Sequence, residues 1–361
     1  MDKRVVFAVV GSGKTTLLTD SLRADSRALL LTHTRNNESH LRARVIQRIG
    51  FIPSVIRVMT WFEFLHDFCC RPLLQHQMQI RGLSFAVPVL RVPRSHRLHF
   101  QDAAGRVYHR RLSLLLMHRK MMADIRARLE RYFDVLLIDE VQDFAGHDFK
   151  FLLELSRAGI SVLLVGDYYQ HTFDTSRDGN INATLHENIT RYESRFTEAG
   201  ILPDRNTLRK TWRCSQTVCE FITSELHIPV EAHVSCQSQI KTVNNHEQAA
   251  ELFADDRIIK LFYLELHRYG CFSMNGGAIK GLDDFNDVYI VLGSTHWPFL
   301  TRNCLSGLPP STRNKLYVAC SRVRGNIWFV PGTLSLLFFF RRALAATAAG
   351  RFLQPALLEC A

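Results

Sequence analysis

The sequence predicts an α/β protein with two domains built on parallel sheets. Apolar runs of strand character alternate with segments of helical spacing, which is typical of parallel sheets whose strands are joined by helices. Two of these runs, residues 135–138 and 162–165, are followed by acidic residues, as expected at the sheet edge where α/β proteins bind ligands. A chain of 361 residues is long enough for two domains, each with its own core.

The first predicted elements follow one another in a regular order. Apolar strand-like runs occupy residues 5–10, 27–32 and 55–59. Residues 38–49 have helical spacing, and Gly50 ends that pattern. A second helix is expected to open at residue 60. Strand, helix, strand and helix in this order indicate a parallel sheet with helices between the strands.

A glycine-rich turn lies between the first predicted strand and a helical pattern that begins at Leu17. Its sequence is Gly11-Ser12-Gly13-Lys14-Thr15-Thr16. Glycines allow the backbone to curl so that successive N–H groups point at an anion. Lys14 would reach the β- and γ-phosphates of a nucleotide, and Thr15 would hold Mg²⁺. The turn therefore predicts a nucleotide phosphate site, and the alternative is a structural turn.

Acidic and amide side chains follow the two later strands. Asp139 and Glu140 come directly after residues 135–138. Nucleotide hydrolysis needs one carboxylate that binds the metal and another that orients and deprotonates the attacking water. Asp139 is suited to the first role and Glu140 to the second. Gln170 follows the strand at 162–165 and could bond both the attacking water and the γ-phosphate. The alternative is a set of ordinary loop residues.

The charge balance indicates a polyanionic partner. Lys and Arg number 45 against 34 Asp and Glu, for a net charge of +11. From about residue 71 the chain becomes rich in arginine, with Phe85, Phe100 and Tyr108 interleaved. This stretch predicts an inserted basic subdomain that contacts a phosphate backbone. A solvated helical face is the alternative interpretation.

The cysteine pattern indicates a reducing compartment, so we expect a cytoplasmic protein with free thiols. The nine cysteines include no Cys-x-x-Cys pair. His233 and Cys236 could form half of a zinc site, but no second half is evident, so no metal other than Mg²⁺ is expected. No signal peptide is expected, and the apolar run at 334–340 is too short to span a bilayer, so we expect no membrane association.

Taken together, these segments resemble motifs of the UvrD/Rep-like superfamily 1 DNA helicases. Residues 11–16, 139–143 and 166–170 resemble motifs I, II and III. Residues 32–36 resemble motif Ia, and residues 60–64 resemble the family's Thr-Phe-His-Ser-Phe segment. Motifs IV, V and VI are resembled by residues 208–215, 280–290 and 317–324, respectively. The resemblance covers about residues 5–330. It implies two RecA-like P-loop motor domains, with a small, basic, mainly helical insertion in the first.

The domain boundaries follow from this resemblance. The first motor domain is expected at residues 1–70 and 126–204, the insertion at 71–125, the second motor domain at 205–335, and a helical tail at 336–361. The large insertion that usually follows motif IV is absent, so the chain resembles a compact member of the family.

The resemblance also implies roles for individual residues, with ATP and Mg²⁺ as cofactors. Catalytic roles fall to Glu140, Gln170, Arg213 and Arg322, of which the two arginines would reach the γ-phosphate. The nucleotide would be held by Gly11, Ser12, Gly13, Lys14, Thr15, Thr16, Trp212 and Asp283, with Trp212 stacking on adenine, and the metal by Thr15 and Asp139. Contacts to nucleic acid would come from His33, Trp61, Phe62, Phe173 and Lys280. For each aromatic residue the alternative is core packing.

The function implied is an ATP-dependent translocase or helicase that moves 3′ to 5′ on single-stranded DNA, or on DNA with single-stranded tails. ATP hydrolysis in a cleft between the motor domains would drive the movement. A glutamine before motif I is missing and Gly277-Ala278-Ile279 replaces the usual His-x-Ser of motif V. These departures favour an alternative, a nucleotide-gated ATPase or switch subunit of a larger complex. A nuclease or other effector would be its protein partner.

Overall fold

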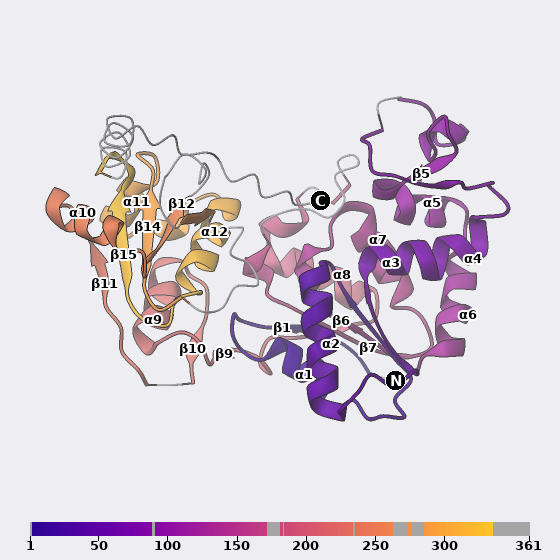
Figure 1. Cartoon of the computed structure of the whole chain (residues 1–361), viewed down its shortest axis with the longest axis horizontal. Helices are drawn as coiled ribbons and strands as arrows, with labels where there is room; N and C mark the ends of the chain where they lie inside the picture. Colours follow the sequence, from indigo (N-terminus) through magenta and orange to yellow (C-terminus); the bar gives the residue numbers. More distant parts are fainter. Residues whose placement is uncertain are drawn as a thin grey trace, which may run out of the picture. The chain divides into compact units, whose positions relative to one another are not determined.

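A computed structural model describes residues 2–88, 91–171, 181–182, 184–233, 235–262, 273–275 and 285–334. The chain divides into two compact units, Met1–Thr211 and Trp212–Ala361 (Figure 1). Within the described residues, the first unit contains a six-stranded sheet and the second a five-stranded sheet, and every strand pair in both is parallel. The predicted α/β class is confirmed.

The sheet of the first unit places the ends of its strands at one edge. Its order is β3-β2-β6-β7-β1-β8. The strands are β1 (Lys3–Phe7), β2 (Ala28–Thr32), β3 (Ile56–Thr60), β6 (Val135–Ile138), β7 (Ser161–Gly166) and β8 (Leu202–Asp204). Because all are parallel, the segments that follow β1, β6 and β7 begin at the same edge, and these three strands are adjacent. The glycine-rich loop therefore follows an inner strand, β1, which lies between β7 and the edge strand β8.

Helices cover both faces of this sheet because successive strand residues point to opposite sides. Val6 and Leu30 pack in a cluster with residues of α1 (Lys14–Asp20) and α2 (Arg35–Ile49). The neighbouring residues Val5 and Leu29 pack in a second cluster on the other face. That cluster includes residues of α6 (Met122–Tyr132), α7 (Gly146–Leu155) and α8 (Ile189–Glu198). The inner strand β2 is therefore buried along its whole length, whereas the edge strand β8 is largely exposed.

The stretch between β3 and α6 carries the basic insertion. It begins with α3 (Trp61–Glu63), whose N-terminus is capped by a capping box between Thr60 and Glu63. The chain continues through the π-helix η1 (Phe64–Cys70). The remaining elements are α4 (Arg71–Leu74), β4 (Gly82–Ser84), η2 (Arg97–His99), β5 (Arg106–Tyr108), η3 (His109–Arg111) and α5 (Leu112–His118). β4 and β5 form a parallel pair. Of the three aromatic residues interleaved with arginines, Phe100 and Tyr108 are buried and Phe85 is exposed.

The second unit is smaller and has its own core. Its sheet, in the order β11-β15-β14-β12-β13, comprises β11 (Ile240–Thr242), β12 (Ile259–Phe262), β13 (Ser273–Asn275), β14 (Val288–Leu292) and β15 (Ile327–Pro331). Its described helices include α9 (Gln216–Glu225), α10 (His246–Ala254), α11 (Trp297–Thr301) and α12 (Pro310–Cys320). Further described elements after β8 are the short strands β9 (Lys210–Thr211), at the end of the first unit, and β10 (Glu231–Ala232), and the 3₁₀ helix η8 (Leu305–Gly307). Ala249 and Phe253 of α10 pack with Tyr289 and Val330 of the sheet.

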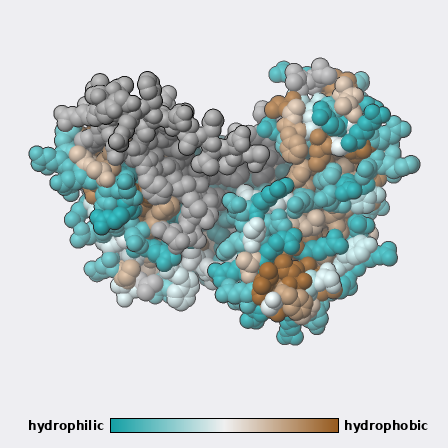
Figure 2. Space-filling view, viewed as in Figure 1, coloured by the Kyte–Doolittle hydropathy of each residue, from teal (hydrophilic) through white to brown (hydrophobic). Residues whose placement is uncertain are grey.

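The surface of the first unit is mostly hydrophilic, with apolar patches among the polar residues (Figure 2). Large apolar side chains exposed near the end of α2 include Ile46, Phe51 and Val55. No helix in the part of the chain that the structure describes is long and apolar enough to cross a membrane.

The cysteines in the described ranges are free thiols that differ in exposure. Cys69 and Cys70 are buried in η1, and burial raises the pKa of Cys70 to about 12 and that of Cys69 well above its usual range. Because the thiolate is the reactive form, we expect iodoacetamide to modify exposed Cys236 rapidly in the folded protein and to spare Cys69 and Cys70 until urea is added. Mass spectrometry of tryptic peptides measures each rate, and equal rates in the native state would contradict the described burial.

Candidate active site

The segments that follow β1, β6 and β7, which contain predicted catalytic and nucleotide-binding residues, meet at the carboxyl edge of the first sheet. Phe7, the last residue of β1, pairs with Gly166, the last residue of β7, and Ile138 of β6 pairs with Leu164 of β7. The backbone N–H of Ala8 then donates to the carbonyl of Gly166 at 2.8 Å. The glycine-rich loop is therefore attached to the strand that leads to Asp167 and Gln170.

The glycine-rich loop has the backbone that its sequence predicts. Gly11 has φ 63° and Gly13 has φ 93°, both in the left-handed region that favours glycine. The Ser12 hydroxyl donates to the carbonyl of Val9 at 2.7 Å and closes the turn from within. Lys14 and Thr15 begin α1 as partly exposed residues, and Thr16 is exposed. The loop thus presents its lysine and first threonine at the sheet edge.

Gln142 links the ends of β6 and β7. Its side-chain N–H donates to Glu140 Oε2 at 2.6 Å, and its amide oxygen accepts from the backbone N–H of Asp167 at 3.0 Å. The side chain is fully buried. The link fixes the Glu140 carboxylate relative to the segment that leads to Gln170. Gln142 belongs to the segment 139–143 that resembles motif II, but no separate role was predicted for it.

Gly166 makes this link possible because any side chain there would collide with it. A Cβ added at Gly166 would lie 2.3 Å from Gln142 Oε1 and 2.9 Å from the backbone nitrogen of Val141. Real Cβ atoms do not approach heavy atoms so closely. The close contact between the two strand ends therefore requires glycine at this position.

Asp139 and Glu140 have different surroundings. Asp139 is 6% exposed, and its Oδ1 accepts from the backbone N–H of Glu140 at 2.9 Å. Glu140 is partly exposed and has φ 56° and ψ 45°, the left-handed conformation that non-glycine residues rarely adopt. The oxygen donors of Asp139 and Thr15 are of the kind that Mg²⁺ prefers, and Mg²⁺ usually takes only one or two protein carboxylates beside phosphate and water. The donor set therefore fits a magnesium–nucleotide complex.

Gln170 offers a buried amide at the same edge. It ends the 3₁₀ turn η5 (Tyr168–Gln170), and its side chain is 1% exposed. Neither Oε1 nor Nε2 has a hydrogen-bond partner among the described residues. A buried amide without partners costs free energy, about 1–3 kcal/mol for each unpaired group. At this edge a phosphate oxygen could accept from Nε2, and a bound water could donate to Oε1.

The residues predicted to contact nucleic acid differ in accessibility. His33 is partly exposed, and its ring lies 4.3 Å from that of Phe144, centroid to centroid. Trp61 is 3% exposed, and its ring packs against Phe64, Phe144 and Phe151, so its neighbours would have to move before a base could stack on it. Phe62 is partly exposed. Phe173, Lys280 and Asp283 lie outside the described residues.

Trp212, at the start of the second unit, is 65% exposed. Its ring is stacked on His233, with centroids 3.7 Å apart and planes 10° apart. Among the described residues no group of three or more histidine, cysteine or acidic side chains could hold a metal. The Trp212–His233 pair exposes a flat aromatic surface.

The two predicted arginines lie on segments that the fold of the second unit joins. Arg213 is partly exposed and Arg322 is 4% exposed. The thiol of Cys214, next to Arg213, donates to the carbonyl of Ser321, next to Arg322, at 3.4 Å. Positions 109 residues apart in the sequence are thereby brought close together within one unit.

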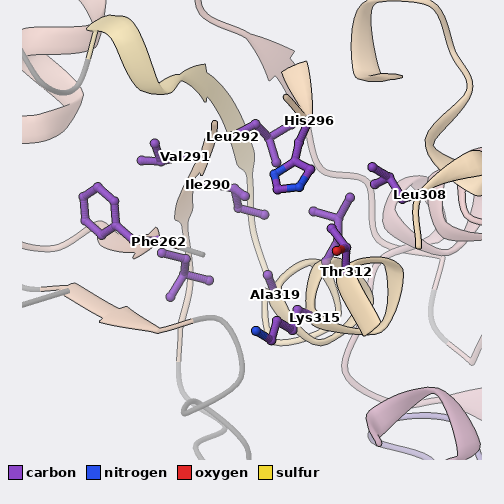
Figure 3. A pocket seen from close by; sticks show the side chains of 11 residues that line it. Phe262, Ile290, Val291, Leu292, His296, Leu308, Thr312, Lys315 and Ala319 are labelled. Atoms are coloured by element: carbon purple, nitrogen blue, oxygen red, sulfur yellow. The ribbon is translucent and has the colours of Figure 1, made fainter. Parts of the chain in front are cut away.

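A small cavity lies between α12 and the strands β12 and β14 (Figure 3). Its lining is mostly apolar, with His296, Thr312 and Lys315 as the polar members, and burial lowers the pKa of His296. The volume is about 30 Å³. A space of this size admits only a few water molecules.

No protein-family model and no curated protein matches the chain. Among solved structures it is similar to the arterivirus nonstructural protein 10 (helicase) in complex with DNA. The identity is 14% and the TM-score 0.44, over 91% of this chain and 60% of that chain. A crystal structure of arterivirus nonstructural protein 10 (helicase) gives 15% identity and a TM-score of 0.43, over 93% and 61%. The chain spans about 60% of the length of these proteins.

Proposed function

We propose that the chain is an ATP-dependent translocase or helicase of superfamily 1 type that acts on single-stranded DNA. The observation that carries the ATPase part is the Gln142 link, which holds Glu140 beside the segment of Gln170 at the edge where the glycine-rich loop begins. A phosphate-binding loop, a positioned carboxylate and a buried amide are what hydrolysis of a phosphoanhydride requires.

Each residue at this edge has a separate role in the proposed reaction. The loop N–H groups and Lys14 bind the phosphates of ATP. Glu140 orients the attacking water and accepts its proton, and Gln170 accepts from the water through Oε1 and donates to the γ-phosphate through Nε2. Mg²⁺ held by Thr15 and Asp139 would neutralise phosphate charge when bound.

The second unit is proposed to complete the nucleotide site. A guanidinium suits the charge that develops on the γ-phosphate, and we assign this role to Arg213 and Arg322. The exposed ring of Trp212 is proposed to stack on adenine, supported by His233 on its other face. Asp283 is proposed to contribute to the same site.

The nucleic-acid part of the proposal is supported by charge and by the motif order. The net charge of +11 favours a polyanion. His33, Phe62, Phe173 and Lys280 are proposed to line the path of the strand, with 3′ to 5′ movement by resemblance to the UvrD/Rep-like helicases. Trp61 would join them only after a rearrangement of its core neighbours. A nuclease or other effector as protein partner belongs to the same proposal.

An ATPase assay with and without single-stranded DNA tests this function. We expect phosphate release to depend on Mg²⁺ and to rise on addition of oligothymidylate. Lys14→Ala should lower turnover at least about 100-fold because the phosphates lose a positioned cation. Lys150→Ala, an exposed lysine on α7, is the matched control and should leave turnover unchanged.

Two outcomes would redirect the proposal. ATP binding without any stimulation by DNA would count against a translocase. The alternative from the sequence is a nucleotide-gated switch subunit. It would be favoured if turnover were insensitive to Glu140→Gln while a co-purified partner bound only in the presence of ATP.

A further inference from the structure

We propose that Phe62, Phe85 and His109 form an aromatic platform on the basic insertion, and that this platform stacks a base of single-stranded nucleic acid. The inference deepens the proposed function, on which it rests for the class of ligand. Phe62 is already a predicted nucleic-acid contact, and the insertion was predicted to contact phosphates; the new element is a base-stacking site that Phe85 and His109 of the insertion form with Phe62.

The parallel pairing of β4 and β5 places Phe85 beside His109. The last paired residues are Ser84 and Tyr108, so the next residue of each strand leaves the pair at the same end. The ring centroids of Phe85 and His109 are 4.9 Å apart with 33° between the planes. His109 Nδ1 donates to the carbonyl of Ser84 at 3.2 Å, which fixes the imidazole against β4.

Phe62 joins these rings to the edge of the main sheet. It lies on α3, directly after β3, and its ring centroid is 5.7 Å from Phe85 and 6.3 Å from His109. His66 stacks on Phe62 with 5° between the planes, at 6.2 Å. The platform therefore starts where the sheet of the first unit ends and continues onto the insertion.

The exposure of Phe85 distinguishes the platform from core packing. Phe85 is 66% exposed, whereas Phe100 and Tyr108 of the same insertion are buried. Leaving a large apolar ring in water forfeits the free energy of burial. Ring contacts on one side hold Phe85 while its remaining surface faces solvent, so it presents a face to a planar partner.

The charges around the platform favour a phosphate-bearing partner. Residues 71–125 contain ten arginines and lysines against two aspartates. Arg81 precedes β4, Arg110 follows His109, and both are exposed. Within the described residues neither forms an ion pair, in contrast to Arg106, which pairs with Asp102 at 2.7 Å. A stacking face flanked by available guanidinium groups suits a base and its neighbouring phosphates, and only an unpaired strand exposes a base face.

Fluorescence anisotropy with the full chain tests the platform. The probe is a fluorescein-labelled oligothymidylate, without nucleotide. We expect Phe85→Ala to weaken binding about tenfold, since one stacked base is lost, and Phe85→Trp to retain it. Phe51→Ala is the matched control, because Phe51 is 57% exposed on the same unit but lies outside the insertion. It should bind like the wild type.

A second probe separates stacking from phosphate contacts. It is an oligomer of abasic nucleotides with the same number of phosphates. The wild type should bind it more weakly than oligothymidylate, and Phe85→Ala should cause no further loss. An unchanged melting temperature of Phe85→Ala will show that the variant is folded.

The two proposals fail in different ways. If Phe85→Ala binds oligothymidylate as tightly as the wild type, the platform is overturned. The proposed function would still hold in that case if DNA stimulated ATP turnover by the wild type and by the variant. If the variant weakens binding to both probes equally, the ring contributes without stacking, and the platform is also overturned. Absence of any oligothymidylate binding by the wild type would overturn both.

Discussion

Replacing Glu140 by glutamine is expected to lower ATP turnover about 1,000-fold while ATP still binds. Glutamine has nearly the shape of glutamate, so the hydrogen bond from Gln142 can persist to its amide oxygen. It cannot accept a proton from water, and loss of a general base costs about 10²–10⁴-fold in rate. Steady-state phosphate release measures turnover, and titration calorimetry with Mg²⁺ and ATP measures binding.

The matched control removes a different carboxylate of the first unit, one to which no role in ATP hydrolysis is assigned. Glu198→Gln, on α8, neutralises an exposed residue and should keep both turnover and ATP affinity. If Glu140→Gln hydrolyses ATP at the wild-type rate, Glu140 is not the base, and the assignment of this edge as an active site loses its central residue. Loss of ATP binding would instead mean that the substitution disrupts the fold of the edge.

The second large effect is expected from Gly166→Ala. The added methyl would lie 2.3 Å from Gln142 Oε1 and 2.9 Å from the backbone nitrogen of Val141, so the two strand ends must separate or Gln142 must leave its place. Overpacking of this kind costs about 1–3 kcal/mol of the free energy of unfolding. Displacement of Gln142 also releases Glu140, so we expect turnover to fall at least about tenfold.

Urea denaturation of the variant reports the first effect and phosphate release reports the second. Gly293→Ala provides the comparison, because its nearest contact would be a comfortable 3.9 Å from His296 Nδ1. It should unfold at the wild-type urea concentration. A Gly166→Ala protein as stable and active as the wild type would show that the link between β6 and β7 is looser than described.

The position of the glycine-rich loop and of the acidic strand ends could be predicted from the sequence because their signals are local. The pattern of a strand, a glycine turn and a lysine at the start of a helix lies within about a dozen consecutive residues, so it can be recognised from the sequence alone. Parallel strands then place their following residues at a common edge whatever the details of packing. For the same reason Asp139, Glu140 and Gln170 could be placed near the loop without coordinates.

Other features depend on pairing between distant residues and were not predictable. The Gln142 link joins positions 25 residues apart and requires the register of β6 against β7. Phe85 and His109 meet only because β4 and β5 pair in parallel, 24 residues apart. Periodicity also could not distinguish buried Trp61, Phe100 and Tyr108 from exposed Phe85, since each lies among similar neighbours.

The backbone of Glu140 has a consequence for efforts to engineer this protein. A glutamate with φ 56° occupies a conformation that costs an ordinary L-residue about 1–2 kcal/mol and that asparagine tolerates better. A library selected only for thermal resistance should therefore enrich asparagine at position 140. Under the proposed function the selected asparagine variants would lack the general base, so selection for thermal stability alone would remove the ATPase activity. Screens of this chain should score turnover alongside melting temperature.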